Sequence, residues 1–294
     1  MSGNAGRVLT TLALVVGCAP GWAEEANAKV AEQKKAAREN WSLLEAGEPA
    51  HLETAHLLIY ASGALEGRLK DISTILERHY AVAEKALKPD PQKELWPGKL
   101  TVYLFTEREQ FTTYVRRVEK RRPDRDETSN HAVEGDFPRV FAGPPRSKSA
   151  GGLEASAGQE VAAALLQRKA GSRVILPDWL LVGFGRATTW RAFPAAESTR
   201  QARQQAAAAV VSKKRTAQQV WGPDLTPDEA AVLRPALADL LAYGPGAPHF
   251  LAFLTGFRPE EGQERKSTEQ ALEAAGIKLA NLEVIWPGFV RAPR

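Results

Sequence analysis

Cysteine is almost missing from this sequence of 294 residues, which contains a single one, Cys18. No disulfide can therefore form within the chain, and the fold has to be held by apolar packing and hydrogen bonds. Charged residues make up 25% of the chain and the net charge is +4, a balance that is typical of a globular protein. The basic residues are spread out and no nucleic-acid motif accompanies them, so we expect no nucleic-acid partner.

The usual signatures of hydrolase chemistry are missing as well. No two of the five histidines are four positions apart, so no helix presents the histidine pair of a zinc peptidase. There is no Gly-x-Ser-x-Gly elbow for a serine nucleophile and no glycine loop that would hold a phosphate. His51, Glu53 and His56 lie close together in the sequence and have ligand chemistry, but nothing else converges on them. We therefore interpret these histidines as solvent-facing or at the edge of the core.

The first residues have the features of an export signal. Arg7 precedes an apolar segment at 8–17 that is too short to cross a bilayer as a mature helix, and Ala23 offers a small-residue cleavage site. We therefore predict a signal peptide over residues 1–23 and a periplasmic or extracellular protein. In the alternative, residues 15–18 act as a bacterial lipobox, and a lipid on Cys18 anchors the protein to a membrane of the cell envelope.

The next part of the chain is predicted to form a charged lead-in helix or linker, followed by a small α/β lobe. Residues 24–50 are charged and alanine-rich, with few large apolar side chains to pack. The lobe covers residues 51–150, and periodicity and turn residues predict these elements in it: strands at 56–61 and 100–105, a helix at 67–87, a helix with a capping box of Thr106 and Glu109, and edge strands around Gly135.

Residues 151–294 are predicted to form a mostly helical lobe. Capping boxes place helix starts after Thr226 and Ser267, and Pro235 is expected to bend or restart the first of these helices. Residues 195–211 are rich in alanine, glutamine and arginine and predict an exposed helix or arm. In one alternative, this arm mediates assembly of a structural envelope protein.

The stretch from Gln159 to Gly185 carries the most specific pattern in the chain. Two paired helical segments there match a known arrangement at Glu160, Leu165, Leu166, Leu176, Pro177, Trp179, Leu180 and Gly183. These segments resemble the active-site region of the gluzincin metallopeptidases, in particular the peptidase MA-like proteins. The resemblance covers roughly residues 52–291 and is weak outside this stretch. It implies an α+β fold in which a small N-terminal strand and helix lobe packs on a mostly helical C-terminal lobe.

The zinc ligands of that family do not occur at the matching positions. The family binds zinc through the two histidines of an HExxH helix and a glutamate from the following helix, while the glutamate of the motif acts as general base. Gln159 and Ala163 stand at the two histidine positions, and Val182 stands at the position of the third ligand. Only Glu160, at the general-base position, remains. The resemblance thus implies a fold that has lost its zinc chemistry and uses no metal or other cofactor.

Two charged features of the sequence, Glu160 and the basic run at 116–125, require an explanation. A buried carboxylate at Glu160 is costly when unpaired, so we expect either that Arg186 or another cation of the second helix pairs with it, or that Glu160 reaches solvent. The basic run at 116–125 is interpreted as a solvated helix end, with a patch for anionic polymers or lipid headgroups as the alternative.

These observations predict a non-catalytic exported protein with an inactivated metallopeptidase-like fold. Its expected role is binding or scaffolding in the cell envelope, with an unknown protein or peptide as partner and with membrane contact only if Cys18 carries a lipid. The alternative is an exported hydrolase or metallopeptidase with a non-standard active site.

Overall fold

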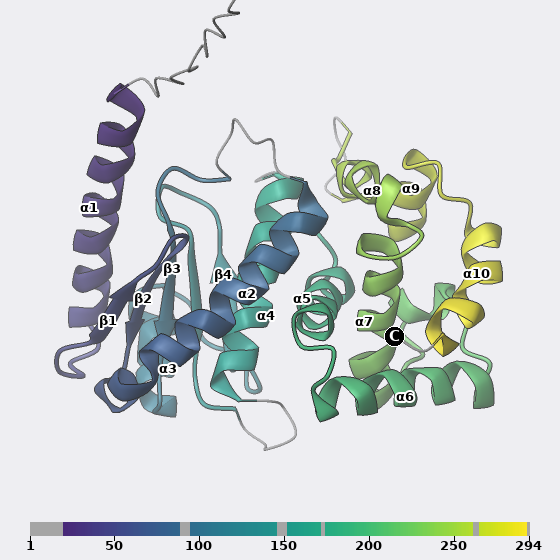
Figure 1. Ribbon diagram of the computed structural model, residues 1–294, viewed down its shortest axis with the longest axis horizontal. Helices are drawn as coiled ribbons and strands as arrows, with labels where there is room; N and C mark the ends of the chain where they lie inside the picture. Colours follow the sequence, from purple (N-terminus) through teal and green to yellow (C-terminus); the bar gives the residue numbers. More distant parts are fainter. Residues whose placement is uncertain (1–19, 89–94, 146–151, 172–173, 261–264, 293–294) are drawn as a thin grey trace, which may run out of the picture.

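The chain folds into a mixed five-stranded sheet and a set of helices, as a computed structural model shows (Figure 1). The structure describes residues 20–88, 95–145, 152–171, 174–260 and 265–292. Ten α-helices lie in these ranges, and most of them follow the sheet in the chain. The fold is therefore α+β with a mostly helical C-terminal part, which confirms the predicted fold class.

Three parallel strands form the centre of the sheet, and an antiparallel strand closes each edge. The spatial order is β1 (Ala50–Glu53), β2 (Leu57–Ala61), β3 (Leu100–Leu104), β5 (Arg139–Ala142) and β4 (Ser129–Ala132). Every residue of β2 and β3 is buried, as expected for continuous apolar strands that are covered on both faces. Both strands were predicted. Two strands do flank Gly135, as predicted. Of these two, only β4 is an edge strand, because β5 lies inside the sheet between β3 and β4.

Helices cover both faces of the sheet. On one face, α1 (Pro20–Ser42) and α3 (Arg108–Arg117) pack on an aromatic cluster that includes Tyr60, Tyr103 and Phe141. On the other face, α2 (Leu69–Leu87) and α4 (Leu153–Ala170) pack on the alternate strand residues, among them Leu57 and Ile59. Figure 1 shows α1 on one side of the sheet and α2 with α4 on the other.

The lead-in packs better than its composition predicted. Gln33, Ala37 and Trp41 are spaced four residues apart, so they share one face of α1, and each is at most 2% exposed. The Gln33 amide also accepts a hydrogen bond from the Lys99 backbone N–H and donates one to the Lys99 carbonyl. Apart from residues 20–23, which begin α1, the predicted signal peptide and Cys18 lie outside the described residues.

Local capping chemistry predicted two helix starts correctly and one wrongly. Capping boxes of Thr226 with Glu229 and of Ser267 with Gln270 begin α7 (Pro227–Ala242) and α9 (Thr268–Ala274). The box predicted at Thr106 does not form, because the Thr106 N–H donates to the hydroxyl of Ser62 and α3 begins later, without a side-chain cap.

The helical part is completed by α5 (Asp178–Ala192), α6 (Glu197–Ser212), α8 (Phe250–Gly256) and α10 (Leu279–Arg291), and short 3-10 turns lie at Gly63–Arg68, Gln218–Trp221 and Ala247–His249. The segment predicted as an exposed helix or arm is indeed a helix, α6, but it buries Thr199, Ala206 and Val210 and packs on α7 and α10. The α7 helix continues through Pro235 and does not restart there. Within the described ranges, no helix is both long and apolar enough to cross a membrane.

Candidate functional site

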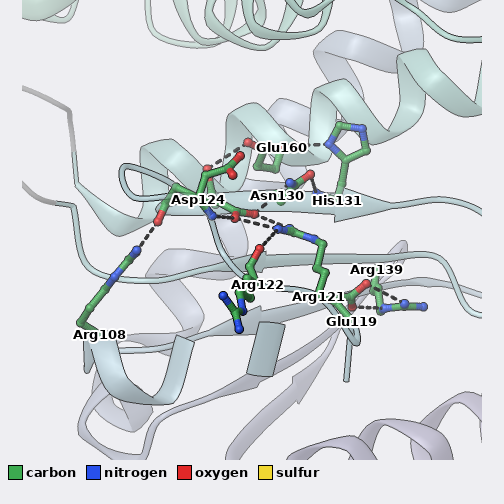
Figure 2. Close-up of polar contacts among 11 residues, drawn as sticks. Arg108, Glu119, Arg121, Arg122, Asp124, Asn130, His131, Arg139 and Glu160 are labelled. Atoms are coloured by element: carbon green, nitrogen blue, oxygen red, sulfur yellow. Dashed lines mark hydrogen bonds and ion pairs between the residues drawn. The ribbon is translucent and has the colours of Figure 1, made fainter. Parts of the chain in front are cut away.

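The site centres on Glu160, which lies in the middle of α4 and faces the edge strand β4. Ser129 and His131 are two residues apart on β4, so their side chains project from the same face of the sheet, toward α4. The Ser129 hydroxyl donates to Glu160 Oε1 over 2.9 Å, and His131 Nδ1 lies 2.7 Å from Glu160 Oε2. Figure 2 shows Glu160 beside His131. The carboxylate therefore ties the edge strand to the helix that covers the sheet.

The second helix of the stretch from Gln159 to Gly185 is α5, which lies between α4 and α7 (Figure 1). Gly185 faces α4 so closely that a Cβ there would lie 2.7 Å from the Gln159 carbonyl oxygen. Gly183 faces α7 in the same way, with 2.8 Å between such a Cβ and the carbonyl oxygen of Arg234. The two glycines thus allow direct backbone contact on two sides of α5, which explains why the sequence has glycine at both positions.

The three positions that would hold zinc ligands in the resemblance have different surroundings. Gln159 is partly buried and its backbone contacts Gly185, while Ala163 is 4% exposed. Val182 is 45% exposed. None of these side chains supplies a strong metal ligand. In the part of the chain that the structure describes, no three His, Cys, Asp or Glu side chains are grouped so that they could hold a metal ion.

The predicted pairing of Glu160 with Arg186 does not form. Successive helical residues are about 100° apart, so Arg186 points away from the α4 contact made by Gly185. Its guanidinium donates to the Ala231 carbonyl of α7 over 3.1 Å. Among the described residues no ion pair joins Arg186 to Glu160. Burial lowers the pKa of Arg186, and the nearby charge of Arg234 lowers it further.

A polar network fixes the loop that leads into β4. Glu127 accepts hydrogen bonds from Arg121 at 2.8 Å and from Asn130 at 2.9 Å, and the Arg108 guanidinium donates to its backbone carbonyl (Figure 2). Burial raises the pKa of Glu127, but the hydrogen bonds from Arg121 and Asn130 outweigh it and leave the pKa below its usual range. Arg121 of the basic run is therefore engaged within the protein, as is Arg117, which pairs with Glu45.

Two charged groups near His51 are engaged within the protein. Glu53 pairs with Lys34 and Lys99, whereas His56 lies 2.7 Å from Glu77. His51 is exposed and the His56 side chain is 42% exposed, so both lie at the surface or the edge of the core, as we interpreted them.

His79 is 1% exposed and buried against α4 and α5, where its ring nitrogens contact the Ile75 carbonyl at 2.8 Å and the Thr189 hydroxyl at 3.1 Å. This burial lowers the pKa of His79.

Sequence reasoning missed His131 as the partner of Glu160. The available signal was weak, namely two polar side chains at alternate positions of a short strand, Ser129 and His131. The Nδ1 atom of His131 is held by the Glu160 carboxylate, and its Nε2 atom has no hydrogen bond in the described part of the chain. Both carboxylate oxygens of Glu160 are already engaged, one by Ser129 and one by His131.

No protein-family model matches the chain, and no curated protein matches it. The resemblance to peptidase MA-like proteins therefore stays a prediction from the residues between Gln159 and Gly185.

Proposed function

We propose that this chain is a non-catalytic, exported binding protein that keeps the frame of a peptidase MA-like fold and binds an extended peptide along the free edge of β4. The observation that carries the proposal is the use of Glu160. The residue at the general-base position is engaged in holding β4 on α4, and Gln159, Ala163 and Val182 supply no strong zinc ligands beside it.

The hydrogen-bond pattern of β4 supports strand addition. The Gly143 N–H donates to the Thr128 carbonyl over 2.7 Å, and Ser129 and Ala142 are the next pair in the register. Hydrogen-bonded and non-hydrogen-bonded pairs alternate in an antiparallel ladder, so the backbone groups of Ser129 and His131 point away from β5. The His131 N–H is satisfied by Asn130 Oδ1. The Ser129 N–H and the carbonyl groups of Ser129 and His131 have no partner within the described ranges, and they offer the edge that an added strand uses.

Binding of peptides to the mature protein, beginning at residue 24, tests this proposal. The probe is an immobilised library of random decapeptides, and each binder is remade with N-methyl groups at alternate residues. N-methylation removes backbone donors without changing the side chains, so binding by strand addition is expected to fall at least tenfold in one of the two methylation registers. Binders that tolerate both registers equally would contradict the proposal.

The zinc content of the same protein tests the loss of metal chemistry. After zinc loading and desalting we expect less than about a tenth of an equivalent, which is background for a site without ligands. The triple variant Gln159→His, Ala163→His and Val182→Glu is expected to gain zinc affinity if the alignment with the HExxH helix is right. A folded triple variant that binds no zinc would count against that alignment.

A hydrolase or metallopeptidase with a non-standard site is the second candidate, and the His131–Glu160 pair is the observation that favours it. Near-stoichiometric zinc in the wild-type protein, or peptidase activity that is lost in His131→Ala, would establish this alternative. The location of the protein is tested separately, because the mass of the exported form distinguishes cleavage after Ala23 from lipidation at Cys18.

A further inference from the structure

Two arginines lie together where α5 meets α7. Arg186 is on α5, and Arg234 is on α7 at the point where Gly183 lets the two backbones touch. Both side chains are partly buried, and Arg186 donates a hydrogen bond to the Ala231 carbonyl, which lies about one helical turn before Arg234 on α7. Arg186 is four residues after Val182, so both lie on the same side of α5.

The protein supplies no counter-charge to this pair in the part that the structure describes. Arg186 donates only to the uncharged Ala231 carbonyl, and the Nε of Arg234 is buried without a hydrogen-bond partner. Neither guanidinium lies within 4.0 Å of a carboxylate of the described residues.

Three other partly buried arginines are neutralised by carboxylates. Arg139 pairs with Glu119 at 2.6 Å, and Arg191 pairs with Asp239 at 2.5 Å. Arg215 contacts Glu229 at 2.9 Å. Arg186 and Arg234 differ from these three in that neither has a carboxylate partner among the described residues.

Such a pair is costly without an anion. A guanidinium stays protonated at neutral pH, so burial and like-charge repulsion act as a cost in stability and not as a loss of the proton. A guanidinium offers its N–H groups in a planar fork that matches the two oxygens of a carboxylate or of a phosphate. An oxyanion between the two arginines would offset the repulsion and satisfy the Arg234 Nε.

We propose that Arg186 and Arg234 form an oxyanion-binding site, which takes the carboxylate or phosphate group of a ligand at the junction of α5 and α7. The site does not require the peptide proposal to hold, because inorganic phosphate and acetate are sufficient probes.

The test measures thermal unfolding of the full mature protein, with phosphate or acetate replacing chloride at constant ionic strength. Ligands that bind the folded state raise the unfolding temperature as their concentration passes the dissociation constant. The variants are Arg186→Gln and Arg234→Gln, and the matched control is Arg116→Gln, which removes one charge from an exposed position. Arg186→Lys keeps the positive charge but lacks the planar guanidinium, and it replaces Arg186→Gln in the test if that variant does not fold.

We expect a saturable rise in the wild-type protein with at least one of the two anions, the same rise in Arg116→Gln, and at least tenfold weaker binding in the Arg186 and Arg234 variants. In chloride, Arg234→Gln is expected to unfold at the same temperature as the wild type or higher, because it removes the repulsion. A peptide with a free carboxyl terminus and its amidated form then show whether the carboxylate comes from a peptide. Two results would overturn the site. One is that the unfolding temperature of the wild type does not change up to about 100 mM of either anion, and the other is that both arginine variants respond to the anion as strongly as the wild type.

Discussion

The contact between His131 and Glu160 makes a quantitative prediction about the edge strand. If Glu160 acts mainly as a tie between β4 and α4, then replacing either residue by alanine destabilises the fold, and the two losses are not additive. A hydrogen bond to a charged group contributes about 1.5–3 kcal/mol to stability. The two side chains are 11% and 20% exposed, so solvent screening reduces the coupling to about 1–2 kcal/mol.

The coupling is measured in a double-mutant cycle of His131→Ala, Glu160→Ala and the double variant. Urea unfolding at pH 7, followed by circular dichroism, gives the four free energies of unfolding. The cycle removes the separate contribution of the Ser129 hydrogen bond, because both Glu160 variants lose it. His56 and Glu77 form a matched control with the same 2.7 Å separation but side chains that are 42% and 24% exposed, so their coupling is expected to be smaller.

Hydrogen exchange gives the local readout for the same variants. Glu160→Ala is expected to increase exchange in β4 and in the loop before it, with little change in α6 or α10. A coupling below about 0.5 kcal/mol, combined with unchanged exchange in β4, would refute the view that Glu160 holds the edge strand.

Three further predictions concern packing and pH. Gly185→Ala forces a methyl group against Gln159, so we expect a net loss of about 1–2 kcal/mol in urea unfolding, whereas Gly288→Ala meets nothing within 4 Å and should be neutral or stabilising. Trp41→Ala is expected to cost about 3–4 kcal/mol because the side chain is 2% exposed, and a loss below about 1 kcal/mol would mean that α1 is not part of the core. The Arg215 hydrogen bond lowers the pKa of Glu229 to about 2, so its stabilisation is complete above the unfolded pKa and is lost as the pH falls through about 2. Glu229→Gln should therefore flatten the stability curve between about pH 5 and pH 2, and parallel curves for the two proteins would contradict this assignment.

Sequence reasoning predicted the elements whose signal is local. The apolar runs of β2 and β3 and the stripe of α2 are properties of a few adjacent residues, and the boxes at Thr226 and Ser267 need only a span of four residues. The prediction was wrong where a distant partner decides the outcome. The Thr106 N–H is taken by Ser62, and the few apolar residues of α1 suffice because a complementary aromatic face exists on the sheet.

The candidate site shows the same division. The frame of two helices with Glu160 on the first could be predicted from residues 159–185. The partner of Glu160 could not, because Ser129 and His131 come from a strand that is 31 and 29 residues earlier in the chain, and a single sequence does not reveal which strand ends beside α4. Arg186 was the nearest cation on the expected helix, but the direction of its side chain is set by the contact of Gly183 with α7.

The contact between α4 and α5 explains how the two proposed binding sites, the edge of β4 and the Arg186–Arg234 pair, keep a fixed position relative to each other. In a zinc peptidase of the kind that this stretch resembles, the metal joins the first helix to the second. Here the backbone of Gln159 meets Gly185 directly, so close packing performs that task without a ligand set. The same α5 contacts α7 through Gly183, which places Arg186 beside Arg234. A methyl group at Gly185 would therefore shift α5 relative to both β4 and α7. We therefore expect Gly185→Ala to weaken peptide binding and anion binding together. The shift of α5 alone would explain both losses, without a separate effect on each site.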